Sequence, residues 1–184
     1  MQERIQYTLH QAGENSSELK KVLDHYQNQP EKLKAARFLI AHIPAHRSYV
    51  GKEIDSLKQM KKESIQQGRI SDEIVTHWKS FDYSSSQVVK DIDVIKADIL
   101  IENIDLAFEA WEKRSWSKQY SFEDFCEYVL PYRIGDEPLE KWRRIYYERY
   151  SPVLDSLYQG NDVVEAARVM ANYLKEEGFT NHTD

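Results

Sequence analysis

Turn-forming residues are scarce in this chain, and that scarcity restricts the folds that it can adopt. Among 184 residues there are only six glycines and five prolines. A sandwich or barrel of many strands needs a turn roughly every 8–12 residues, and such turns are rich in glycine and proline. The composition therefore favours long helices. Apolar residues make up 41% of the chain, which is too high a fraction for a disordered protein.

Apolar residues recur at the i, i+3, i+4, i+7 spacing of amphipathic helices over most of the chain. Helices are predicted up to Gly13 and over 16–26, 30–44, 51–67, 71–78, 95–113, 122–130, 139–157 and 161–178. Residues 88–94 alternate in part, which indicates at most one short extended segment. The sequence thus predicts an all-α fold, a compact bundle of eight or nine helices. We expect residues 1–184 to form a single domain, with 81–90 as the place for any internal boundary.

Charge and hydropathy exclude several classes of protein. The chain carries 25 Lys and Arg against 31 Asp and Glu, a net charge of -6, which disfavours binding to nucleic acid. No stretch approaches the roughly 20 apolar residues of a transmembrane segment. The first residues, MQERIQYTLHQAGEN, lack the hydrophobic region of a signal peptide.

The residue types that carry catalysis or bind metals do not form a recognisable motif. Cys126 lies among aromatic and acidic neighbours, which is typical of a packed thiol with a raised pKa rather than of a nucleophile. His42 and His46 have the i, i+4 spacing of zinc ligands, but Pro44 between them breaks the helix that the geometry needs. No P-loop, G-x-G-x-x-G or G-x-S-x-G occurs. We expect no catalytic residue, no metal ligand and no cofactor in this chain.

Aromatic residues gather in the second half of the chain. Thirteen lie between Phe108 and Tyr158, against five in residues 1–80. The densest mixture, YVLPYRIGDEPLEKWRR at 128–144, places prolines, a glycine, aromatics and charges in one helix–loop–helix connection. Aromatic side chains edged by arginine are typical of interfaces, yet the same residues can form a structural corner. The candidate docking or binding residues are Tyr128, Tyr132, Arg133, Glu137, Trp142 and Arg144.

Two local contacts are predicted around this corner. Ser121 and Asp124 have the spacing of a helix capping box, with Asp in place of the usual Glu. Arg133 is expected to reach back over the last carbonyls of the 122–130 helix, or to pair with Glu137 or Glu140.

Three segments resemble the N-terminal helical region of bacterial transglutaminase-like proteins. They are KLKAARFLIAHIPAHRSY at 32–49, ADILIENIDLAFEAW at 97–111 and SFEDFCEYVLPYRIGDEPLEKWR at 121–143. The similarity covers roughly 13–178. In that family the helical region precedes a papain-like core with a Cys-His-Asp triad, in which the Cys follows Gly-x and the His precedes Trp-Asn. Neither motif occurs here, so the resemblance implies a catalytic domain after residue 184.

The resemblance leads to a hypothesis about function. The chain is expected to be a non-catalytic N-terminal domain that docks on, and helps to shape, a transglutaminase-like cysteine hydrolase or transferase domain in the same polypeptide. The alternative is a module that binds an envelope glycan or peptide through the aromatic corner at 128–150. A third hypothesis makes the chain itself an enzyme that uses Cys126. The family implies an exported protein, periplasmic or at the cell surface, with the cytoplasm as the alternative location.

Overall fold

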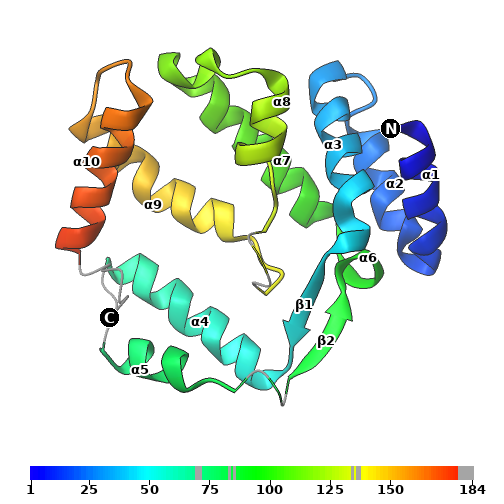
Figure 1. Cartoon of the computed structure of the whole chain (residues 1–184), viewed down its shortest axis with the longest axis horizontal. Coiled ribbons are helices and arrows are strands. Elements are labelled where there is room, and N and C mark those ends of the chain that lie inside the picture. Colours follow the sequence, from blue (N-terminus) through cyan, green and yellow to red (C-terminus); the bar gives the residue numbers. More distant parts are fainter. Residues whose placement is uncertain (69–71, 83, 85, 134, 136–137, 178–184) are drawn as a thin grey trace. The chain divides into compact units, whose positions relative to one another are not determined.

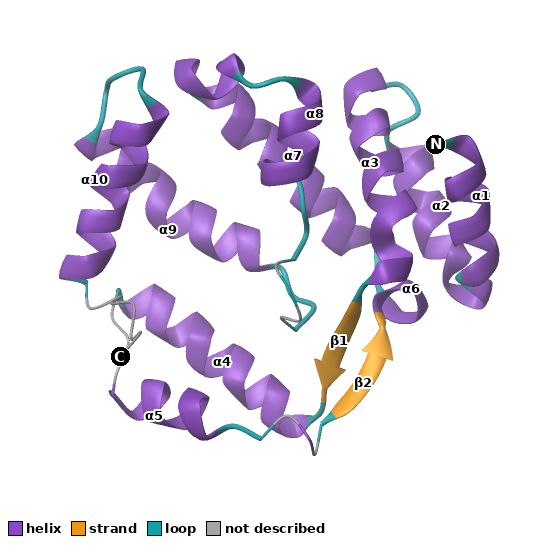
Figure 2. Cartoon of the chain, viewed as in Figure 1, coloured by secondary structure: helices purple, strands orange, loops and turns teal. Residues whose placement is uncertain are grey.

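The computed structural model describes residues 1–68, 72–82, 84, 86–133, 135 and 138–177. Helices dominate this part of the chain (Figure 2), so the predicted all-α class is confirmed. The described residues form ten α-helices, one more than the upper prediction, because short helical turns are counted separately. No helix of the described residues is long and apolar enough to span a membrane.

The chain divides into two units, each discontinuous in sequence. The first unit comprises Met1–Val50 and Gln87–Arg143, and the second comprises Gly51–Ser86 and Arg144–Asp184. The chain therefore passes from one unit to the other three times. One of these passages, between Ser86 and Gln87, lies within 81–90, where the sequence placed any internal boundary.

Four helices build the core of the first unit. The helices α1 (Gln2–Gln11), α2 (Ser16–His25) and α3 (Pro30–His42) pack against one another, and α7 (Ala97–Lys113) lies against α2 and α3 (Figure 1). Burying a large aliphatic or aromatic side chain contributes about 1.5–3 kcal/mol. The fully buried side chains of this core include Leu19, Ile40, Leu100, Ile104 and Phe108.

Polar side chains of α2 and the turn before it fix the start of α7. The Asn15 amide donates hydrogen bonds to the carbonyls of Ile92 and Ile95, each at 3.0 Å. The Glu18 carboxylate accepts from the backbone N–H of Ala97 at 2.9 Å. These bonds satisfy backbone groups that helix ends leave without partners. They hold the single-turn helix α6 (Asp91–Val94) and the start of α7 in place.

A two-stranded antiparallel ribbon completes the first unit. The strands β1 (Arg47–Val50) and β2 (Gln87–Lys90) pair with Arg47 opposite Lys90 and Val50 opposite Gln87. The sequence predicted one extended segment at 88–94, of which 91–94 is instead the helix α6. The strand β1 was not predicted, because its four residues show little alternation and its partner strand lies about 40 residues away in the chain.

The aromatic segment after α7 forms a capped turn that changes helix type. Ser121 and Asp124 make the predicted capping box: the Asp124 N–H donates to Ser121 Oγ at 3.0 Å, and the Ser121 N–H donates to the Asp124 carboxylate at 3.3 Å. The helix α8 (Phe122–Asp124) then continues as the π-helical turn η5 (Phe125–Val129). The Phe125 ring stacks on Trp111 at 4.5 Å between centroids, which fixes the turn on α7.

The second unit contains α4 (Lys52–Gln67), α5 (Asp72–Ser80), α10 (Val163–Glu176) and most of α9 (Trp142–Leu157). Gly68 ends α4 with a left-handed φ of 68°, as the sequence predicts. The cap of α10 is Asp162, whose carboxylate accepts from the Val164 N–H at 2.8 Å. The buried apolar side chains described in this unit are few: Ile54, Leu57, Ile65, Tyr150 and Ala166.

Candidate docking surface

A buried ion pair lies at the centre of the predicted aromatic corner. The Arg133 guanidinium donates to the Asp91 carboxylate at 2.7 Å, and the two side chains are 2% and 0% exposed. Asp91 also accepts hydrogen bonds from the Tyr132 hydroxyl at 2.8 Å and from the Ser48 hydroxyl at 2.5 Å. Arg133 donates to Ser48 Oγ at 3.0 Å as well. A buried carboxylate needs such partners, because its charge loses the stabilisation that water provides.

This network joins three segments of the first unit. Ser48 lies on β1, Asp91 begins α6, and Tyr132 and Arg133 follow the π-helical turn. Burial and the negative charge of Asp91 raise the pKa of the Tyr132 hydroxyl, which therefore stays protonated and donates. The network fixes the loop after η5 on the ribbon. Its role is structural.

A second arginine holds the end of the π-helical turn. The Arg143 guanidinium donates to the carbonyl of Val129 at 2.6 Å and to that of Pro131 at 3.1 Å. It also donates to the Asn103 side chain at 2.9 Å. The sequence predicts that Arg133 either covers these carbonyls or pairs with Glu137 or Glu140. The structure corrects the first alternative, because Arg143 covers the carbonyls and Arg133 pairs with the buried carboxylate of Asp91.

The six candidate residues separate into different roles. Counted over the whole residue, Tyr132 is 3% exposed and Arg133 is 4% exposed. They therefore cannot form the docking face that the sequence suggested. Trp142 is half-buried and donates its indole N–H to the carbonyl of Tyr132 at 2.7 Å. Arg144 is exposed, belongs to the second unit and pairs with Glu148 at 3.3 Å. Glu137 lies outside the described residues.

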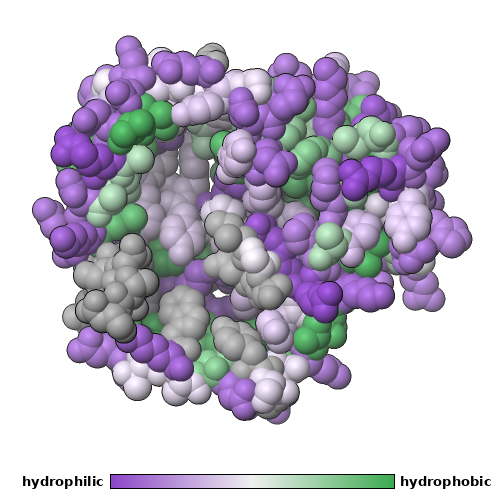
Figure 3. All heavy atoms as spheres, viewed as in Figure 1, coloured by the Kyte–Doolittle hydropathy of each residue, from purple (hydrophilic) through white to green (hydrophobic). Residues whose placement is uncertain are grey.

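Tyr128 alone among the described candidates presents its ring to solvent, with 79% of the residue exposed. It stands beside an open hollow of about 710 Å³ between α3 and the α8–η5 segment, which we call the α3 groove. One wall of the groove carries Lys34, Arg37 and Phe38 from α3. The opposite wall carries Phe122, Glu123, Asp124, Glu127 and Tyr128. On the face drawn in Figure 3, polar side chains prevail over α1, α2 and α3, with apolar ones between them.

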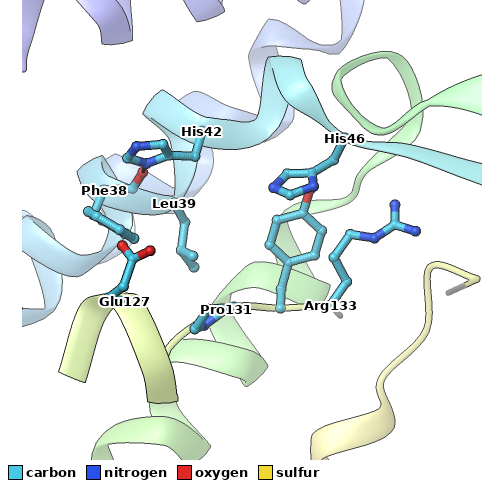
Figure 4. Close-up of a pocket in the computed structure, with 8 residues that line it drawn as sticks. Phe38, Leu39, His42, His46, Glu127, Pro131 and Arg133 are labelled. Atoms are coloured by element: carbon cyan, nitrogen blue, oxygen red, sulfur yellow. Dashed lines mark hydrogen bonds between the residues drawn. The ribbon is translucent and has the colours of Figure 1, made fainter. Parts of the chain in front are cut away.

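A smaller pocket of about 200 Å³ adjoins the α3 groove and shares Phe38 and Glu127 with it. Figure 4 shows His42 on α3 and His46 just after the end of that helix. The Arg133 guanidinium is directed away from Glu127. Burial lowers the pKa of the His46 imidazole, and the positive charge of Arg133 lowers it further. Two histidines and a carboxylate thus line one pocket. Nevertheless, no three His, Cys, Asp or Glu side chains in the described ranges are placed to hold a metal ion.

Cys126 lies at the base of the α3 groove and is 3% exposed. Burial raises the pKa of its thiol to about 12, and the carboxylates of Glu123 and Glu127 add to the shift. A nucleophilic cysteine needs the opposite environment, with a lowered pKa and an open approach. The packed-thiol interpretation of the sequence therefore agrees with the structure.

Three residues of this region belong to no functional motif of the sequence: Ser48, Asp91 and Arg143. Each has both charged and apolar neighbours in the sequence, so no local pattern marks it as buried. Buried polar groups are hydrogen-bonded, and the partners here lie far away in the chain. Asp91 and Arg133 are separated by 42 residues, and Ser48 and Arg133 by 85.

No family model, no curated protein and no solved structure matches the chain. The similarity to transglutaminase-like proteins therefore stays a prediction from the sequence.

Proposed function

We propose that this chain is a non-catalytic docking domain whose first unit binds another polypeptide through the α3 groove. The partner that the resemblance suggests is a transglutaminase-like domain in the same polypeptide. The observation that carries the proposal is Tyr128, an aromatic ring with 79% of the residue exposed on the rim of a large open hollow. Large aromatic side chains on a surface are typical anchors of protein interfaces.

The support beneath Tyr128 strengthens the proposal. The π-helical turn that carries it is capped by Ser121 at one end and held by Arg143 at the other. Phe125 anchors the same turn on α7. The backbone that carries Tyr128 is thus held in place before binding, so its ordering costs little conformational entropy when a partner arrives, and this increases affinity.

An envelope glycan is a weaker candidate for the occupant. Stacking on sugar faces through the aromatic corner needs at least two exposed rings in one concave surface. Among the described ring-bearing residues that line the α3 groove, Phe38 and Phe122 are half-buried and only Tyr128 is exposed. A polypeptide can instead use the charged side chains of both walls.

The test begins with the coding sequence that follows codon 184. The segment that it encodes is expressed separately, and its association with residues 1–184 is measured by isothermal titration calorimetry. We expect binding, and we expect Tyr128→Ala to weaken it by about tenfold or more, as the loss of an anchor does.

The control is Tyr120→Ala, which removes a ring that is 43% exposed and does not line the groove. It is expected to leave the affinity unchanged. Absence of a following segment would exclude the partner in the same polypeptide. Equal effects of the two substitutions would exclude the α3 groove as the docking surface.

A further inference from the structure

The α3 groove has walls of unequal charge. Lys34 and Arg37 project from α3, and Glu31 precedes them on the same helix. The opposite wall holds Glu123, Asp124 and Glu127 and contributes no cation among its described residues. Four carboxylates and two cationic side chains thus line the groove, together with the N-terminal residue Met1, and every charged side chain on its α8–η5 side is acidic.

Four of these charged side chains have no hydrogen-bond or ion-pair partner in the described part of the chain, whereas Asp124 has one. Asp124 is engaged in the capping box with Ser121. The side chains of Lys34, Arg37, Glu123 and Glu127, by contrast, make no hydrogen bond or ion pair with any residue that the structure describes. The two acidic side chains are exposed, one helical turn apart, on a segment that is held in place at both ends.

The negative field of this wall reaches the base of the groove. Glu123 and Glu127 both raise the pKa of the buried Cys126 thiol, after burial itself. An acidic side chain placed against the α8–η5 wall would meet this field unfavourably, because like charges placed together at an interface cost affinity. A cation that lies against the same wall would gain from it.

Apolar surface lies beside the acidic wall. The Tyr128 ring is exposed, and the rings of Phe38 and Phe122 are half-buried on opposite sides of the hollow. An occupant that matches the whole groove therefore needs an apolar side chain as well as a cation.

We propose that the α3 groove binds a short polypeptide segment that carries lysine or arginine next to large apolar side chains. Its cations face Glu123 and Glu127, and its apolar side chains lie between Phe38, Phe122 and Tyr128. This inference rests on the proposed docking function and adds the chemistry of the partner. A second copy of this chain and an acidic peptide are the competing occupants.

Three fluorescein-labelled dodecapeptides provide the probes: one of Leu and Lys, one with Glu in place of Lys, and one with Ser in place of Leu. Their binding to residues 1–184 is measured by fluorescence anisotropy at low and at physiological salt. We expect the Leu–Lys peptide to bind at least about tenfold more tightly than either of the others. Its affinity should fall as the salt concentration rises.

The decisive variant is the double charge reversal Glu123→Lys with Glu127→Lys. It is expected to lower the affinity for the Leu–Lys peptide by at least about tenfold and to raise the affinity for the Leu–Glu peptide. Glu14→Lys, an exposed residue of the first unit outside the groove, is the matched control and should change neither. Circular dichroism verifies that all variants are folded.

Several results would overturn the inference: no binding of the Leu–Lys peptide at about millimolar concentration, equal binding of the acidic peptide, or equal effects of the groove reversal and the control. A dimer in sedimentation that the groove reversal dissociates would assign the groove to a second copy instead. Tyr128→Ala could weaken binding of the downstream segment while the charge reversal leaves peptide binding unchanged. In that case the docking function stands, and only the inference that the occupant is basic is wrong.

Discussion

At the scale of single residues, the most consequential pair is Asp91 and Arg133. Both charges are buried, and each supplies the other's principal partner. A buried ion pair is weak evidence for net stability, because desolvation of the two groups opposes their attraction. Removal of one partner is strongly destabilising, since it leaves the other charge buried and uncompensated.

Asp91→Asn is therefore expected to lower the free energy of unfolding by about 3 kcal/mol or more. Urea denaturation followed by circular dichroism gives the measurement. Asp93→Asn, two residues along the same turn and exposed, is the matched control and should change stability by less than about 0.5 kcal/mol. Similar values for the two variants would contradict the assignment of Asp91 to a buried network.

Cys126 provides a prediction about pH at the same scale. Its thiol pKa is raised to about 12 in the folded chain from an ordinary value of 9.0, because burial disfavours the thiolate. The unfolded chain therefore loses this proton first, and the stability that the protonated thiol contributes is present below about pH 9 and lost between pH 9 and 12.

We accordingly expect the native thiol to react with a disulfide reagent at pH 8 more than a hundredfold more slowly than the thiol of the urea-denatured chain. The reaction is followed by absorbance. Rapid labelling of the Cys126 thiol in the native protein at pH 8 would contradict the packed-thiol interpretation and support the hypothesis of a catalytic cysteine. The Cys126→Ala variant should show a smaller loss of stability between pH 9 and 12 than the original chain.

At the scale of elements, the helices follow from the sequence and the ribbon does not. The apolar spacing of α2 and of α7 repeats every three to four residues, so each helix is specified within its own segment. The strand β1 is four residues long and becomes a strand only because β2 pairs with it. The register depends on residues that are distant in the chain, and no local pattern encodes it.

The same distinction explains the candidate surface. Tyr128, one of the candidate docking residues, is exposed, although its spacing from Phe122 and Phe125 places it on the same apolar stripe of the predicted helix. Tyr132 and Arg133 could not be placed, because their burial depends on Asp91 from a different element. Arginine beside aromatic residues is compatible with both an interface and a buried network until the counter-charge is located.

Two adjacent arginines at the start of α9 allow a matched test of how η5 is held. Arg143 donates to two carbonyls and to Asn103, whereas Arg144 is exposed. Burial lowers the pKa of Arg143 to about 10, so this guanidinium remains charged at neutral pH.

Arg143→Lys removes the planar fork and is expected to lower the free energy of unfolding by about 2 kcal/mol. Arg144→Lys should change it by less than about 0.5 kcal/mol. Hydrogen exchange of residues 122–131, measured by mass spectrometry, should accelerate in the first variant only. Unchanged exchange in Arg143→Lys would show that the turn does not depend on this arginine.

At the scale of the whole molecule, the two units differ in how much apolar surface they bury. The connected core of fully buried side chains belongs to the first unit. In the second unit, tyrosines at 146, 147, 158 and 173 and the apolar residues of α10 other than Ala166 are only partly covered or exposed in the described ranges. Local stability follows the buried apolar contacts of a region.

Amides of α4 and α10 are therefore expected to exchange with deuterium faster than those of α2, α3 and α7 under native conditions. Mass spectrometry of peptic fragments gives the comparison. A substitution in the first core, Ile40→Ala, should accelerate the slow amides of the first unit by lowering its stability by about 2–5 kcal/mol. Uniform protection across the chain would indicate a single cooperative structure.

The antiparallel ribbon ends where the chain leaves the first unit and returns to it. Val50 and Gln87 face each other at the last pair of the ribbon, and the 36 residues between them all belong to the second unit. A pair of facing residues is the position that a two-residue Asn-Gly hairpin can close. The ribbon thus brackets residues 51–86, and we expect 1–50 and 87–143, joined by such a turn, to fold as a shorter protein that keeps every residue lining the α3 groove.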